Sequence, residues 1–162
     1  MQLRKLKTED APRMLEWMHD KSVVSHLGTD FSKKTLEDCL GFISASLQDE
    51  GNLHLAIADD EDTYMGTVSL KHIDRQAKNA EFAITVRACA MGKGFSACGM
   101  KEILRMGIEE IGLQDIYWCV SPKNARAVRF YDKHGYLRAD TVPAQILGNY
   151  PQDLELIWYV YR

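Results

Sequence analysis

Residues 80–97 read AEFAITVRACAMGKGFSA, and within them a strand pattern changes to a helix pattern around two glycines. Apolar residues first alternate with other side chains, which is the period of two that is typical of a strand. Gly92 and Gly94 follow, and a long amphipathic helix begins just after them. Glycines let a phosphate approach the backbone, and the first amides of a helix are unpaired donors at its positive end. With Arg87 and Lys93 as flanking cations, this turn suits a pyrophosphate.

Other interpretations of this turn are possible from the residues alone. Two glycines before a helix also occur in an ordinary tight turn. The spacing Gly92-x-Gly94-x-x-Ala97 formally matches a dinucleotide-binding fingerprint, but that motif needs a parallel βαβ unit and an acidic residue ending the next strand. Here the preceding strand belongs to an antiparallel meander, and the next strand ends at residues 119–121, CVS. A P-loop is excluded because Gly94 follows Lys93 where Ser or Thr is required.

The rest of the chain predicts one α+β domain with a mixed, mostly antiparallel central sheet flanked by helices. Short turns join the strands expected at 53–58, 64–73 and 80–86, so these three strands must be antiparallel neighbours. The expected order is β-α-α-β-β-β-α-β-α-β-β. The remaining elements are strands at 2–6, 115–120, 136–142 and 153–161, helices that begin near 11, 36 and 95, a helix from Asn124 to His134, and a loop at 143–151.

Composition favours a soluble, cytoplasmic protein. The 162 residues suit a single domain that spans 1–162, since domains most often contain about 100–150 residues. A net charge of −3 and the lack of a basic block argue against nucleic acid as a partner. No apolar run approaches the roughly 18 residues of a membrane span, so no membrane partner is expected. Residues 1–7 lack the apolar stretch of a signal peptide.

The cysteines and histidines show no pattern of a metal site or a disulfide framework. Cys39, Cys89, Cys98 and Cys119 form no C-x-x-C pair, and the five histidines form no H-E-x-x-H motif. We therefore expect reduced cysteines that act mostly as packing residues, and no metal.

A second informative segment is residues 121–136, SPKNARAVRFYDKHGY. A strand and then N-x-R-A-x-x-x-Y-x-K-x-G-Y, downstream of a glycine loop, resembles the GCN5-related N-acetyltransferase (GNAT) superfamily over essentially the whole chain. Residues 80–82, AEF, and 4–11, RKLKTEDA, look most like the bacterial branch that acetylates ribosomal-protein N-termini. Related members in polysaccharide gene clusters act on nucleotide-linked amino sugars. The resemblance implies a GNAT-type fold with acetyl-CoA as co-substrate.

The resemblance also implies where acetyl-CoA would bind. The family's phosphate loop, Gln/Arg-x-x-Gly-x-Gly/Ala, falls on Met91, Gly94 and Ser96, of which only Gly94 matches. The missing cation at Met91 should weaken phosphate contact, and Arg87 or Lys93 could compensate. The implied cofactor-binding residues are Ile84, Thr85 and Val86 for pantetheine, then Arg87, Gly92, Lys93, Gly94, Phe95, Ser96 and Ala97 around the pyrophosphate, and Asn124 beside the cofactor arm.

Acetyl transfer to an amine requires a proton acceptor and a proton donor. A lysine-like ammonium, with a pKa of about 10.4, is no nucleophile until it loses a proton. Glu81 is the candidate base, working through water; the alternative is an exposed carboxylate paired with a lysine. His72 and His134 are weaker candidates. Tyr131 matches the family's general-acid tyrosine, and a packing residue is its alternative. We expect direct attack in a ternary complex, although Cys119 leaves a covalent intermediate open.

The acceptor is expected to bind between the variable segments 21–31 and 141–151, with Trp17, Phe31 and Tyr150 as candidate substrate-binding residues. The predicted function is transfer of an acetyl group from acetyl-CoA to a primary amine, a peptide or ribosomal-protein N-terminus, by a monomer or homodimer. Acetylation of an amino sugar or another small amine is one alternative. A non-catalytic acyl-CoA-binding sensor is another.

Overall fold

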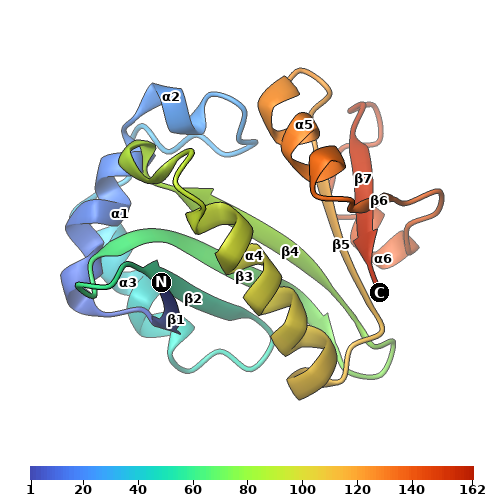
Figure 1. The fold of residues 1–162 in the computed structure, drawn as a ribbon, viewed down its shortest axis with the longest axis horizontal. Coiled ribbons are helices and arrows are strands. Elements are labelled where there is room, and N and C mark those ends of the chain that lie inside the picture. The colour runs from blue at the N-terminus through green and yellow to red at the C-terminus, as the bar shows by residue number, and fades with distance from the viewer.

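The computed structural model describes residues 1–162, which form a seven-stranded sheet with helices on both faces (Figure 1). The strand order is β1-β2-β3-β4-β5-β7-β6, and only β4 and β5 are parallel neighbours. The predicted α+β class with a mostly antiparallel sheet is confirmed. The strands are β1 (Gln2–Lys5), β2 (Leu53–Ala58), β3 (Tyr64–Asp74), β4 (Asn79–Val86), β5 (Asp115–Val120), β6 (Leu137–Arg138) and β7 (Ile157–Tyr161). The helices are α1 (Ala11–Met18), α2 (Lys21–Val24), α3 (Leu36–Ser46), α4 (Phe95–Met106), α5 (Ala125–Lys133) and α6 (Ala144–Leu147), with short helical turns at Thr8–Asp10, Ala88–Ala90 and Gly107–Ile111.

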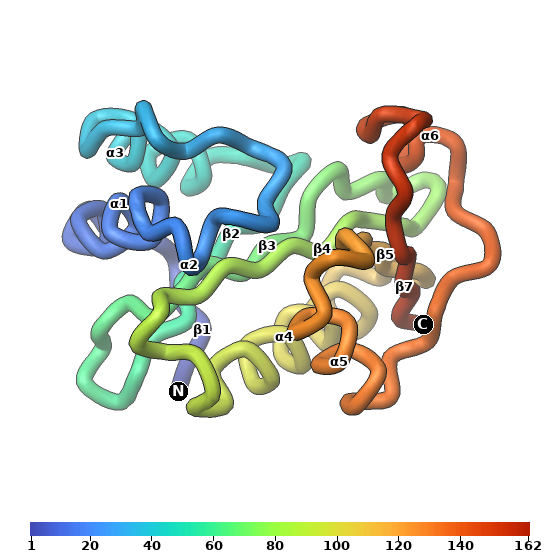
Figure 2. The backbone as a smooth tube through the Cα atoms, turned by 90° about the horizontal axis from the view of Figure 1, so that it is seen from above, coloured from blue at the N-terminus to red at the C-terminus, as the bar shows by residue number.

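The helices divide between the two faces of the sheet. Figure 2 shows α4 and α5 on one face and α1, α3 and α6 on the other. Because side chains alternate along a strand, Phe82 and Trp118 pack in the large core beneath α4 and α5. Glu81 and Tyr117 point to the opposite face, where Tyr117 packs with Ile146 of α6. The face that carries Glu81 is therefore covered by the N-terminal helices at one end and by α6 at the other.

The parallel strands β4 and β5 separate soon after they begin. Their pairing covers only Asn79–Glu81 against Asp115–Tyr117, and beyond these residues the strands diverge (Figure 1). Each strand keeps its other neighbour, because β4 pairs with β3 as far as Val86 and β5 pairs with β7 as far as Val120. We call the gap beyond Glu81 the β4–β5 opening. It leaves a row of peptide groups on each facing edge without a partner strand.

A glycine on the inner face of helix α4 lets the helix backbone pack directly against a side chain of the sheet. A Cβ added at Gly99 would lie 2.6 Å from Cδ1 of Ile57 in β2. The helix begins after Gly94, which has a φ of +87°, and its last turns end at Gly112, which has a φ of +86°. Such positive φ values favour glycine, since they cost other residues energy. Gly112 thus ends the helical segment.

Two residues of the segment 4–11, Arg4 and Asp10, form an ion pair that stabilises the fold. The Arg4 guanidinium donates to both carboxylate oxygens of Asp10 at 2.8 and 2.9 Å, and it also contacts Asp62. Asp10 is only 3% exposed and precedes α1 directly. The pair thus ties β1 to the beginning of α1, and both residues lie in the stabilising framework of the fold.

Several local predictions are confirmed, and others need correction. The helix predicted to begin near residue 36 starts with a capping box of Thr35 and Asp38, and Asn124 caps α5, where a helix was predicted. The closing strands are much shorter than expected, and the segment predicted as a loop at 143–151 contains α6. The strand β3 has a bulge that the sequence pattern did not predict, because two residues, His72 and Ile73, stand opposite one residue of β4.

All four cysteines are free thiols, but not all of them pack in the core as predicted. Cys39 is fully buried, whereas Cys89 and Cys98 are exposed, so the expectation of mostly packed cysteines is corrected for these two. Cys119 is half-buried and lies at the β4–β5 opening. None of the helices is long and apolar enough to span a bilayer.

Candidate active site

The start of α4 presents a run of free backbone donors. The amides of residues 92–97 donate no hydrogen bond to any carbonyl or side chain of the protein, and the first helical bond runs from the Cys98 amide to the Gly94 carbonyl at 3.0 Å. Gly92 and Gly94 both have positive φ values, +75° and +87°, which turn the chain into the helix. Unpaired amides at the positive end of a helix bind anions. This observation fits the diphosphate of coenzyme A.

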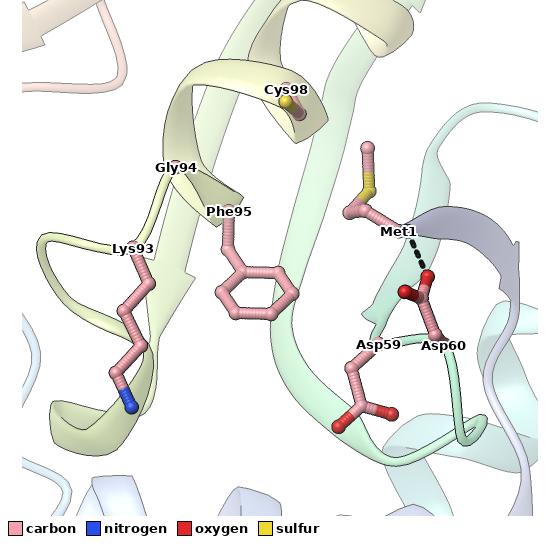
Figure 3. A pocket seen from close by; sticks show the side chains of 7 residues that line it. All are labelled: Met1, Asp59, Asp60, Lys93, Gly94, Phe95 and Cys98. Carbon is pink, nitrogen blue, oxygen red and sulfur yellow. Dashed lines mark hydrogen bonds and ion pairs between the residues drawn. The ribbon is translucent and has the colours of Figure 1, made fainter.

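A shallow pocket of about 220 Å³ lies beside this turn (Figure 3). Phe95 forms its wall, and Lys93 extends along the other side of the loop. The chain's N-terminal ammonium binds Asp60 there at 2.8 Å, and Asp59 lies next to it. The pocket thus has carboxylates along one side and the Lys93 ammonium on the other.

The two arginines nearest this loop have different partners. Arg87 donates to both carboxylate oxygens of Glu16 at 2.9 and 3.1 Å, and also to the Tyr64 carbonyl, so its guanidinium is held against α1. Arg126 of α5 reaches across to the loop, where its Nη1 lies 3.2 Å from the Met91 sulfur. Arg126 belongs to the N-x-R-A motif at the start of α5, but its contact with the loop was not predicted, because α5 and the loop are distant in the chain.

Helix α5 places Asn124 and Tyr131 near the β4–β5 opening. Asn124 Oδ1 accepts from the Ala127 amide at 3.2 Å, which leaves its amide nitrogen free. The Tyr131 ring packs against Trp118 and Tyr159, with centroid distances of 5.6 and 5.1 Å. Unlike the hydroxyls of Tyr150 and Tyr159, that of Tyr131 makes no hydrogen bond in the protein. Burial is the main cause that raises the pKa of Tyr131, so the hydroxyl keeps its proton at neutral pH.

Glu81 is the last residue of β4 that pairs with β5, so it lies at the point where the β4–β5 opening begins. It is 1% exposed, so the alternative of an exposed edge carboxylate is wrong. Its Oε1 accepts from the Tyr150 hydroxyl at 2.5 Å, while Oε2 is buried without a hydrogen-bond partner. Lys71 Nζ and His72 Nε2 lie 3.7 and 4.0 Å from Oε2. The neighbouring lysine of that alternative is thus present, although the carboxylate is buried.

Cys119 lies on β5, two positions beyond the residue paired with Glu81. Burial raises its pKa to about 11, and the nearby Glu81 charge adds to this, although a hydrogen bond with Tyr150 opposes it. A thiol with so high a pKa is almost entirely protonated at neutral pH and is a weak nucleophile. This environment favours direct transfer over a covalent intermediate.

The aromatic residues expected to contact the acceptor have separate environments. Trp17 is 6% exposed, and its indole nitrogen donates to the Tyr64 hydroxyl at 3.0 Å in the core beneath α1 and α3. This burial argues against direct contact between Trp17 and an acceptor. Phe31 packs edge-to-face on Trp17 at 5.2 Å. Tyr150 alone of the three reaches the β4–β5 opening, and it also borders an apolar pocket of about 420 Å³.

The β4–β5 opening and the free amides of α4 agree with what the comparison with protein families shows. A family model described as an acetyltransferase (GNAT) domain matches residues 1–137. The chain therefore belongs to the GNAT acetyltransferase family, as its sequence resemblance indicated. This membership defines the class of the chain as a GNAT acetyltransferase domain.

More particular similarities are to spermidine acetyltransferases from Vibrio cholerae. The curated spermidine N(1)-acetyltransferase is 26% identical over 91 residues, and the match spans 56% of this chain and about half, 53%, of that relative. The crystal structure of spermidine N-acetyltransferase in complex with CoA and spermine superimposes with a TM-score of 0.79 at 18% identity, covering 99% of this chain and 94% of that one. A dodecameric structure of spermidine N-acetyltransferase gives a TM-score of 0.73 at 17% identity, covering 99% and 92%. At these identities the structural matches show the fold alone.

Proposed function

We propose that this chain transfers the acetyl group of acetyl-CoA to a primary amine by direct attack in a ternary complex. The observation that supports this most strongly is the placement of Glu81, a buried and half-satisfied carboxylate, at the start of the β4–β5 opening. When bound, the coenzyme supplies an activated thioester carbonyl. The free amides of residues 92–97 would hold its diphosphate, and Asn124 would lie beside its arm.

The two proton transfers in this proposal use Glu81 and Tyr131, which lie on opposite faces of the sheet beside the opening. Glu81 Oε2 accepts a proton from the acceptor ammonium through a water, which leaves the amine nucleophilic. Tyr131, whose hydroxyl has no other partner, donates a proton to the departing thiolate. A thiol of pKa about 8.5 leaves more easily when it is protonated. The raised pKa of Tyr131 keeps that proton available at neutral pH.

A backbone donor is available for the carbonyl oxygen of the thioester. The Arg87 amide donates to the Met65 carbonyl on the β3 side at 2.9 Å. Because successive amides of a strand point to alternate edges, the Val86 amide points into the opening instead. Donors aimed at a developing oxyanion commonly contribute the largest share of electrostatic catalysis.

For the acceptor we propose a polyamine-like alkylamine, on the strength of the relative that matches in sequence. The expected peptide or ribosomal-protein N-terminus is the second candidate, because residues 80–82 and 4–11 resemble that branch. Its support is reduced by the ion pair between Arg4 and Asp10, which gives part of the second motif a structural role.

The test combines coenzyme binding with a panel of amines. Titration calorimetry measures the affinity for acetyl-CoA, and thiol release is followed with spermidine, spermine, a peptide with a free N-terminus and an amino sugar. We expect binding and turnover with at least one alkylamine. Preference for the peptide would select the second acceptor candidate. Tight coenzyme binding without turnover on any amine would support a non-catalytic sensor instead, and no binding at all would contradict both.

A further inference from the structure

Tyr150 belongs to the C-terminal part of the chain and contacts Glu81 in β4. The two residues are 69 positions apart, and the Tyr150 hydroxyl donates to Oε1 at 2.5 Å. The Tyr150 ring stands edge-on against Trp158 of β7, with centroids 5.2 Å apart and an interplanar angle of 87°. The orientation of the hydroxyl is therefore fixed by the sheet itself as well as by the loop that carries it.

The second carboxylate oxygen of Glu81 has no such partner. Oε2 is fully buried and accepts no hydrogen bond, although each buried polar atom normally has one. Leaving a buried acceptor unsatisfied costs about 1–3 kcal/mol, and more when the group is charged. An oxygen that remains unsatisfied between strands β3 and β4 points to a partner outside the chain.

The bulge in β3 brings the side chains of Lys71 and His72 toward this oxygen. Consecutive residues of a regular strand point to opposite faces, yet both Lys71 and His72 lie within 4.0 Å of Oε2. His72 has a φ of +52°, and its amide is held by Asn52 Oδ1 at 2.9 Å. Bulges that redirect side chains are frequent next to active sites. Lys71 offsets the buried negative charge, and neither side chain forms a hydrogen bond to Oε2.

We infer that Tyr150 is a positioning residue, which holds Glu81 by its Oε1 and so leaves Oε2 as the one oxygen free to accept a proton. This inference rests on the proposed function and replaces the expectation that Tyr150 contacts the acceptor directly. In the step it serves, the N–H bond of the ammonium breaks and its electron pair stays on nitrogen. The proton passes through the water to Oε2 and later to solvent, while Tyr150 keeps its own proton throughout.

The first test is Tyr150→Phe, which keeps the ring against Trp158 and removes only the hydroxyl. General bases contribute about 10²–10⁴-fold, so loss of their positioning should lower kcat by about 10–100-fold. The KM for acetyl-CoA should stay within twofold. A fall in kcat at an unchanged KM distinguishes positioning of the base from a general loss of structure. Tyr136→Phe is the matched control, since its hydroxyl also lies in an aromatic cluster but not at Glu81.

A double-mutant cycle separates positioning from direct acceptor contact. If Tyr150 acts through Glu81, Tyr150→Phe should change kcat by less than twofold in the Glu81→Gln background. Two outcomes would overturn the inference alone while the proposed function stands. One is that the effects of the two substitutions on kcat multiply fully, and the other is a Tyr150→Phe variant with the wild-type kcat. A wild type that binds acetyl-CoA but acetylates no amine of the panel would overturn both.

Discussion

Replacing Tyr131 by phenylalanine removes a single hydroxyl that the folded protein does not use for its own stability. Because that hydroxyl has no hydrogen-bond partner and the ring contacts remain, the free energy of unfolding should change by less than about 0.5 kcal/mol. The catalytic effect should be far larger. A general acid contributes about 10²–10⁴-fold, which corresponds to about 2.7–5.4 kcal/mol of transition-state stabilisation.

The assay measures thiol release with saturating acetyl-CoA and the best amine of the panel. The kcat of Tyr131→Phe should fall by that factor, while the calorimetric Kd for acetyl-CoA and the melting temperature stay close to those of the wild type. Tyr136→Phe, which removes a hydroxyl from the same aromatic cluster, should keep the wild-type kcat. A Tyr131→Phe enzyme with an unchanged kcat would refute the acid role, and one that is inactive only because it has unfolded would refute the stability reasoning.

Four further perturbations test other parts of the site and fold. Glu81→Gln should lower kcat by about 10²–10⁴-fold, as expected for the loss of a general base, and an unchanged kcat would place the base elsewhere. Gly94→Ala meets no neighbouring atom but requires a φ of +87°, so we expect a loss of about 1–2 kcal/mol in stability and a weaker affinity for acetyl-CoA, read by urea unfolding and calorimetry. Gly99→Ala gains up to about 1 kcal/mol in helix propensity but overpacks Ile57 by about 1–3 kcal/mol, so the variant should be less stable and Ile57→Val should recover part of the loss. Burial raises the pKa of Cys119 from 9.0 to about 11, so the protonated thiol contributes fully to stability below pH 9, and this contribution is lost as the pH rises through 11. The denaturation midpoint should therefore fall between pH 9 and 11, and a flat profile would contradict the burial of the thiol.

Features that depend only on residues close together in the chain could be predicted from the sequence. The alternation in β4, the two glycines before α4 and the Asn124 cap of α5 are all local patterns, and each was found where it was expected. The antiparallel meander followed from turns too short for a crossover. Local signals of this kind fix an element and its ends without reference to the rest of the chain.

What the sequence did not reveal depends on contacts between distant segments. The bulge at His72 is held by the side chain of Asn52, and the Tyr150 hydroxyl meets Glu81 only after the C-terminal segment has folded over the sheet. Arg87 was expected near the phosphate loop because it lies close in sequence, yet its guanidinium is taken by Glu16 of α1. The roles proposed for individual cofactor and acceptor residues remain predictions for the same reason.

Because β4 pairs with β5 only over Asn79–Glu81, the later amides of β4 should differ in their rates of hydrogen exchange. The amides of Ile84 and Val86 face the opening, whereas their neighbours Thr85 and Arg87 face β3. In heavy water the first pair should therefore take up deuterium faster than the second. A coenzyme arm bound along this edge would slow exchange at Ile84 and Val86 selectively, which gives a footprint of binding that needs no knowledge of the acceptor.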